Sequence, residues 1–346
     1  MQLSRRAGNP PLLHDHREVI EMVVVQPIHI LLSIKTTDDV NLSFFSAVVF
    51  RATLSEKGET MRLEPRNAAV LFTVLGDERP TSSLLRAVAI AHVLDADLDV
   101  FRVLPPTSRV NALFPQHNVV DAVYAVEQTL HAHRATKEWL SACLPDGDPA
   151  IDDFVIAHGD FIARVAQQAA ELQPALIVVP SRKGETGNGV TALARASGVP
   201  VLVAREATKE GTIVAATDLE WKGYPVLSRA ATLGAQLDAP VVAIHNLKPA
   251  TTSLGNEKGA LVPLQAAAGT LPVDTRAVVR SEVNAVDAIL EEARVHNADM
   301  VVVGTRERTW FARFFRGNVA AQVVNRAKRS VLVVPLGAKM AEVAAG

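Results

Sequence analysis

Short runs of aliphatic residues recur along the chain and alternate with stretches of helical period. Runs such as Ile177–Val179 and Val301–Val303 contain no polar alternation, which indicates strands buried on both faces of a parallel sheet. Apolar positions three and four residues apart precede both runs and predict amphipathic helices at 161–172 and 285–296. Alternating strands and helices predict an α/β fold with a doubly wound, Rossmann-like parallel sheet and right-handed crossovers.

The pattern occurs twice in the same order. Arg86-Ala87 recurs as Arg229-Ala230, and the late run Val201–Val203 recurs as Val331–Val333. Several blocks repeated in one order indicate two tandem copies of the same α/β unit. The strands predicted for the second copy are 212–217, 241–245, 273–279, 300–303 and 331–334.

The repeat divides the chain into segments. We expect the first domain at 67–206, the second at 210–338 and a short tail at 339–346. Residues 1–66 match neither copy. An accessory β element, a poorly ordered extension and a later translation start at Met61 all fit this segment.

Composition narrows the function classes. The chain has 346 residues, which suits two domains, and its 35 Lys and Arg nearly balance its 37 Asp and Glu. A generally basic nucleic-acid binder is therefore disfavoured. The single cysteine, Cys143, excludes an internal disulfide and a thiolate zinc cage, and we expect it to be a small buried hydrophobe in a helix. The apolar stretch at 22–34 contains Pro27 and is too short to span a bilayer, so we expect a soluble, cytoplasmic protein without membrane contact.

The candidate chemistry lies in the loop after Met300–Val303, because ligands bind beyond the carboxyl ends of parallel strands. Gly304 is expected to let the backbone turn sharply at the end of this strand. Asn318 follows Gly317 just before the helix predicted at 320–328, where asparagine can cap the helix. Four arginines against one glutamate make the loop basic.

This loop resembles that of the universal stress protein family. Nucleotide-binding members have a glycine, two residues, a second glycine, nine residues, then a glycine followed by Ser or Thr. The spacing is kept from Gly304 to Gly317, but Glu307 stands at the second glycine and Asn318 at the hydroxyl position. A carboxylate about 4 Å from a phosphate charge opposes it by about 4 kcal/mol at an effective dielectric near 20. Pairing of Glu307 with a neighbouring arginine would relieve this repulsion.

The resemblance implies an adenine-nucleotide site in the second copy, for ATP or ADP, with magnesium only as the ion of the nucleotide. The same resemblance implies that this site is formed by Ala216, Asp218, Asn246, Gly304, Arg306, Gly317, Asn318 and Val319. His245 ends a buried strand and is expected to be hydrogen-bonded within the fold. The first copy has Pro180 at the first glycine and Leu75 opposite Asp218, so we expect it to be structural.

The resemblance also implies a non-enzymatic stress-response or regulatory protein, in which a nucleotide is a bound signal. A nucleotide-free protein-interaction module is an alternative, favoured by the aromatic residues of the basic loop, such as Trp310 and Phe311. Weak ATP hydrolysis through Asp218 and the arginines of the loop is a further alternative function. We expect the two copies to pair through antiparallel contact of their last strands, 199–204 and 331–334, or a homodimer to form; other protein partners are not indicated.

Overall fold

The computed structural model describes residues 20–25, 29–34, 69–106, 115–145, 148, 154–182, 187–205, 211–219, 224–247, 254–306 and 318–336. The chain divides into two units, Met1–Val48 and Val49–Gly346. In the first unit, β1 (Ile20–Val25) and β2 (His29–Ile34) form an antiparallel hairpin. This hairpin agrees with the accessory β element considered for residues 1–66.

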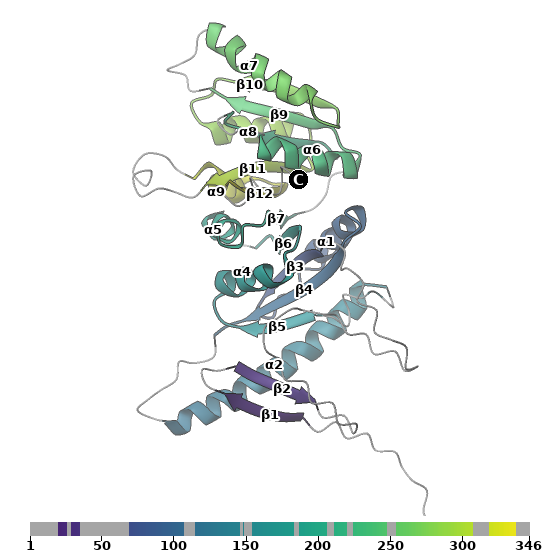
Figure 1. Cartoon of the computed structure of the whole chain (residues 1–346), viewed down its shortest axis with the longest axis vertical. Coiled ribbons are helices and arrows are strands. Elements are labelled where there is room, and N and C mark those ends of the chain that lie inside the picture. Colours follow the sequence, from purple (N-terminus) through teal and green to yellow (C-terminus); the bar gives the residue numbers. More distant parts are fainter. Residues whose placement is uncertain are drawn as a thin grey trace, which may run out of the picture. The chain divides into compact units, whose positions relative to one another are not determined.

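A ten-stranded, mostly parallel sheet forms the centre of the second unit (Figure 1). Its strands lie in the order β10-β9-β8-β11-β12-β7-β6-β3-β4-β5. Read from each outer edge of the sheet toward its centre, the five strands of each copy follow in the order third, second, first, fourth and fifth, so the two copies share one topology. The predicted tandem, Rossmann-like α/β fold is therefore confirmed, whereas the domain boundaries stay a prediction. The strands are β3 (Ala69–Leu75), β4 (Asp97–Leu104), β5 (Phe154–His158), β6 (Leu176–Pro180), β7 (Val201–Ala204), β8 (Ile213–Ala216), β9 (Val241–Asn246), β10 (Thr275–Arg280), β11 (Met300–Arg306) and β12 (Ser330–Leu336).

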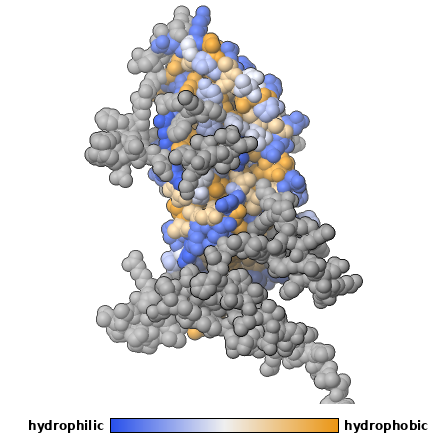
Figure 2. All heavy atoms as spheres, viewed as in Figure 1, coloured by the Kyte–Doolittle hydropathy of each residue, from blue (hydrophilic) through white to orange (hydrophobic). Residues whose placement is uncertain are grey.

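Helices cover both faces of the sheet, which explains why the strands are apolar at successive positions. One hydrophobic cluster joins the strands to α1, α2, α6 and α7, and a second cluster on the opposite face joins them to α4, α5, α8 and α9. In Figure 2, hydrophilic residues are interspersed with hydrophobic ones on the visible face. Within the part of the chain that the structure describes, none of the helices combines the length and the apolar character that a membrane span requires. The helices are α1 (Thr81–Val93), α2 (Pro115–Cys143), α4 (Phe161–Leu172), α5 (Gly187–Ser197), α6 (Pro225–Leu237), α7 (Leu254–Gly269), α8 (Ala285–Val295) and α9 (Val319–Arg326).

The two copies join through β7 and β12, the only antiparallel neighbours in the described part of the ten-stranded sheet. Leu332 lies opposite Leu202 at the centre of this pair, and both are fully buried. The N–H of Arg205 donates to Ser330 Oγ at 3.0 Å, and that hydroxyl donates to the Arg205 carbonyl at 3.2 Å. The predicted pairing of the last strands is thus confirmed, and it makes one continuous sheet within the chain.

The repeated Arg-Ala blocks contribute to the same junction. Arg86 on α1 forms an ion pair with Asp299, which directly precedes β11 of the other copy. Arg229 on α6 donates to the carbonyl of Ala175, which directly precedes β6 of the first copy. Burial lowers the pKa of Arg229 from its ordinary value. Both arginines therefore cross from one copy to the other at equivalent positions, which a pattern within one copy cannot reveal.

Helices α5 and α9 pack against each other beside the β7–β12 pair. The backbone N–H of Gly187, the first residue of α5, donates to Asn325 Oδ1 at 2.6 Å. A Cβ atom at Gly187 would lie 2.0 Å from the carbonyl oxygen of Ala321 on α9. Glycine is required here because the backbone of one helix touches the backbone of the other.

Candidate functional site

Asp218 and Arg306 meet at the carboxyl ends of neighbouring parallel strands. Asp218 follows β8, Arg306 ends β11, and the two strands pair with Ala216 opposite Val303. The Arg306 guanidinium donates to Asp218 Oδ2 across 88 positions of sequence. The side chains are 46% and 40% exposed, so a ligand in solution can reach both. The structure thus brings together the two charged residues that the family resemblance implied for the site.

A tight turn holds the backbone on both sides of Asp218. The Thr217 N–H donates to the carbonyl of Ile244 at 3.0 Å, which ties the end of β8 to β9. The Thr217 hydroxyl accepts from the N–H of Leu219, whose φ of +60° is left-handed. His245 Nδ1 lies 2.8 Å from the Thr217 carbonyl oxygen, so the expectation that His245 is hydrogen-bonded within the fold is confirmed. These bonds hold the backbone on both sides of Asp218 in place.

The amide side chain of Asn246 is already used within the fold. Its Nδ2 donates to the Glu282 carbonyl and its Oδ1 accepts from the Glu282 N–H, both at 3.0 Å. These two bonds hold the segment that follows β10. The amide is therefore engaged within the fold, and a ligand would meet the backbone of Asn246.

Gly304 lies inside β11, so the expected sharp turn at this residue is wrong. The strand continues to Arg306, with Gly304 opposite Val334 on β12, and Gly304 has no left-handed φ. A Cβ atom here would lie 2.5 Å from Leu336 Cδ1 and 3.1 Å from Val226 Cγ2. The glycine makes room for side chains beneath the candidate site, and a strand this long delivers Arg306 to the site.

This steric role predicts a specific coupling. Gly304→Ala is expected to lower the free energy of unfolding by about 1–3 kcal/mol, because the new methyl group overpacks the space next to Leu336. Chemical denaturation measures the change. In a Leu336→Val background, which shortens the contacted side chain, the cost of Gly304→Ala should be smaller. Equal costs in both backgrounds would contradict the steric role.

Asn318 caps α9 as predicted, and it also reaches the first copy. Its Oδ1 accepts from the Ala321 N–H at 3.2 Å, and its Nδ2 donates to Thr191 Oγ1 on α5 at 2.9 Å. No local pattern indicates Thr191, because the contact depends on how α5 and α9 pack. Val319 begins α9 and is 39% exposed. Gly317 and Glu307 lie outside the described residues.

The corresponding region of the first copy is held by its own side chains. Arg182 Nε lies 2.7 Å from Glu78 Oε2, and the guanidinium stacks over the ring of Phe161 at 5.4 Å. Arg102, on β4 at the position equivalent to His245, is 1% exposed and donates to the carbonyls of Gly76 and Glu78. Burial lowers its pKa from the ordinary arginine value. An arginine within an apolar strand was the available sequence signal for this arrangement.

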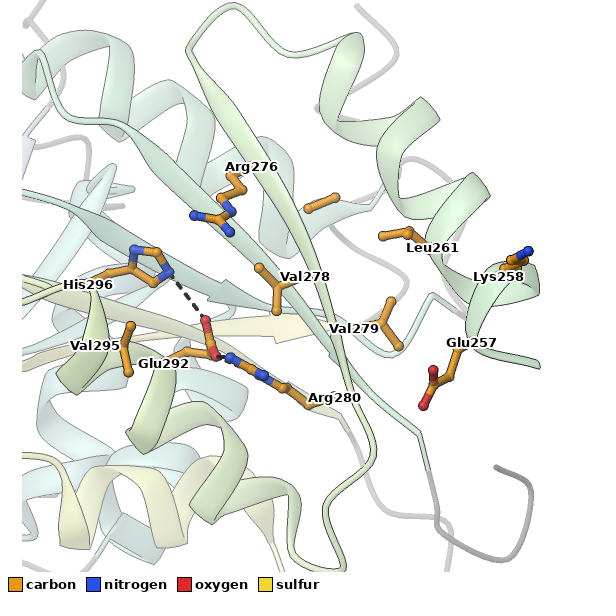
Figure 3. Close-up of a pocket in the computed structure, with 11 residues that line it drawn as sticks. Glu257, Lys258, Leu261, Arg276, Val278, Val279, Arg280, Glu292, Val295 and His296 are labelled. Carbon is orange, nitrogen blue, oxygen red and sulfur yellow. Dashed lines mark hydrogen bonds and ion pairs between the residues drawn. The ribbon is translucent and has the colours of Figure 1, made fainter. Parts of the chain in front are cut away.

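A separate cavity of about 450 Å³ opens at the outer edge of β10, between α7 and α8 (Figure 3). Its lining does not include Asp218 or Arg306. No group of three or more His, Cys, Asp or Glu side chains that could hold a metal ion occurs among the described residues.

Comparison with known proteins identifies the class. Residues 211–335 match the model of the Universal stress protein family. A universal stress protein from Archaeoglobus fulgidus DSM 4304 has a similar fold, with a TM-score of 0.56 and 15% identity over 79% of this chain and 98% of that chain. A protein of the same named class from Pseudomonas aeruginosa UCBPP-PA14 gives a TM-score of 0.51 and 20% identity, covering 77% of this chain and 92% of that chain.

A universal stress protein in complex with cAMP is 26% identical over 38% of this chain and 98% of that chain, with a TM-score of 0.31. No curated protein matches the chain in sequence. Residues 211–335 are a universal stress protein domain. The second copy is thus similar to the universal stress protein family, and the first copy has the same sheet topology as the second.

Proposed function

We propose that the second copy binds an adenine nucleotide, ATP or ADP, where β8 and β11 end. The bound nucleotide would act as a signal in a cytoplasmic stress-response or regulatory protein, and not as a substrate. The observation that carries this proposal is the Asp218–Arg306 pair, which places an exposed carboxylate and an exposed guanidinium together at the ends of adjacent parallel strands. Ligands of open α/β sheets bind in that location.

The two charged groups suit different parts of a nucleotide. A guanidinium binds phosphate oxygens through two parallel hydrogen bonds, which fits Arg306. A carboxylate accepts hydrogen bonds from ribose hydroxyls, which fits Asp218. The N-terminus of α9, at Asn318 and Val319, adds a partial positive charge that favours an anion.

The existing ion pair is a small obstacle to binding. Because both side chains are 40% or more exposed, the pair contributes about 1 kcal/mol or less. Micromolar binding corresponds to about 8 kcal/mol, so a phosphate can take Arg306 from Asp218 at low cost. In this proposal Ala216, Gly304, Gly317 and the Asn246 backbone shape the site, while Asn318 positions the helix.

Calorimetric titration with ATP and ADP tests the proposal. Wild-type protein is expected to bind ATP, and Arg306→Ala to bind it about tenfold or more weakly, because a bidentate charged contact is lost. The same variant should bind adenosine like the wild type, whereas Asp218→Asn should weaken ATP and adenosine alike. Arg326→Ala is the matched control, because Arg326 forms a similarly exposed pair with Asp287. ATP affinity unchanged by Arg306→Ala would contradict the proposal.

A nucleotide-free protein-interaction module is the second candidate. It is favoured because polar side chains of the site already bind other residues of the chain. Arg306 pairs with Asp218, and the Asn318 amide donates to Thr191. The same titration separates the two candidates when Glu307→Gly is measured in parallel. Binding that is absent in the wild type and gained in Glu307→Gly would support the interaction module.

A further inference from the structure

The outer edge of β10 is open for hydrogen bonding. β10 ends the strand order, and only β9 pairs with it in the described part of the chain. On the β9 side, the Asp274 carbonyl accepts from the Val241 N–H, and the Arg280 carbonyl accepts from the Leu247 N–H. Because backbone groups alternate along a strand, those of Ala277 and Val279 point the other way, toward the free edge.

The cavity of about 450 Å³ follows this free edge along the strand. Residues 276–280 of β10 line it, together with side chains from α7 and α8. Figure 3 shows Arg276, Arg280 and His296 on one side of β10, and Leu261 and Lys258 on the other. An extended backbone placed here would bond to β10 and have its side chains directed alternately toward α8 and α7.

The charge around the cavity favours an acidic occupant. Three permanent cations line it (Arg276, Arg280 and Lys258), against two carboxylates, Glu257 and Glu292. Glu292 is 1% exposed and accepts from Arg280 Nε at 2.6 Å, so this carboxylate is buried and paired with the arginine. Among the described residues, Arg276 and Lys258 have no carboxylate partner. These two exposed cations lie on opposite sides of the strand.

Apolar side chains complete the lining. Val279 of β10 and Leu261 of α7 lie on one side of the strand. Val278 of β10 and Val295 of α8 lie on the other side. Val295 is 53% exposed, so its side chain is accessible from the cavity. Main-chain hydrogen bonds, charged groups on both sides and apolar contacts between them are the components of peptide recognition by strand addition.

We infer that the β10 edge binds an acidic, extended segment of a partner protein, which adds to the sheet as an eleventh strand. Main-chain bonds to Ala277 and Val279 would supply affinity, and acidic side chains opposite Arg276 and Lys258 would supply specificity. This inference is independent of nucleotide binding, because the cavity lining does not include Asp218 or Arg306.

The probe is an acetylated and amidated heptapeptide in which glutamate alternates with valine, labelled for fluorescence anisotropy. The full chain is expected to bind it, and to bind a lysine–valine peptide of the same length about tenfold or more weakly, because like charges oppose one another. Arg276→Glu should reverse this preference. Arg134→Glu is the matched control, since Arg134 is exposed on α2 away from the cavity lining, and should keep the wild-type preference.

A backbone variant tests strand addition directly. Ala277→Pro removes an N–H that points to the free edge and leaves the bonds to β9 in place, and proline is tolerated at such edge positions. Peptide affinity should fall about tenfold or more, whereas Ala277→Val, which keeps the N–H, should bind like the wild type. Thermal unfolding of each variant checks the fold. Equal affinity for acidic and basic peptides, no measurable binding, or self-association of the protein through β10 would overturn the inference.

Discussion

Gly187→Ala is expected to lower the free energy of unfolding by about 3 kcal/mol, the upper end for overpacking by a single methyl group. The new Cβ would lie 2.0 Å from the carbonyl oxygen of Ala321 and 2.7 Å from its Cα. Both are backbone atoms of α9, which cannot move aside as a flexible side chain can. The helices must separate, which also strains the bond from the Gly187 N–H to Asn325. Urea denaturation of both proteins measures the difference.

Gly259→Ala is the control for this prediction. Gly259 lies within α7, and a Cβ there would meet no atom within 4 Å. Alanine favours a helix over glycine by about 1 kcal/mol, so this variant should be neutral or more stable than the wild type. Similar destabilisation by both substitutions would show that the close packing of α5 and α9 does not decide the cost.

Leu202→Ala is expected to cost about 2–5 kcal/mol, as is usual for truncation of a fully buried leucine. Leu202 and Leu332 are both 0% exposed and lie opposite each other where β7 meets β12. Each truncation removes apolar surface from the core and leaves a cavity at the junction of the two copies. Leu332→Ala should therefore cost a similar amount. Chemical denaturation followed by circular dichroism measures each value.

The double variant tests whether the two leucines share one space. Its cost is expected to be less than the sum of the single costs, because residues in contact are coupled by about 0.5–3 kcal/mol. Leu85→Ala, a truncation of a leucine that is 49% exposed on α1, should change stability by about 0.5 kcal/mol or less. Additive costs at Leu202 and Leu332 would argue against direct packing across the junction.

The junction also bears on the candidate site. Asn318 caps α9 and donates to Thr191 of the first copy. The first copy therefore supports the helix that begins at the candidate site of the second. A first copy whose own arginines fill the corresponding region can keep this supporting role without binding a nucleotide.

Local patterns in the sequence determined the fold class. Uninterrupted aliphatic runs predict strands covered on both faces, and the repeated blocks predict two copies of one unit. The family resemblance implied Asp218 and Arg306 as site residues, and the two lie together because parallel strands end at a common edge of the sheet. Asn318 could be placed because helix capping depends on adjacent residues only.

Tertiary structure alone decided which surfaces touch. Glycine is needed at 304 because a Cβ atom would meet the Leu336 side chain, and at 187 because it would meet the backbone of Ala321. Arg86 forms its ion pair with Asp299 of the other copy. The partners are 32, 134 and 213 positions away along the chain, beyond the reach of any local periodicity. The open edge of β10 likewise depends on the strand order of the whole sheet. Sequence periodicity specifies which face of an element is buried, whereas only the packed structure specifies what covers that face.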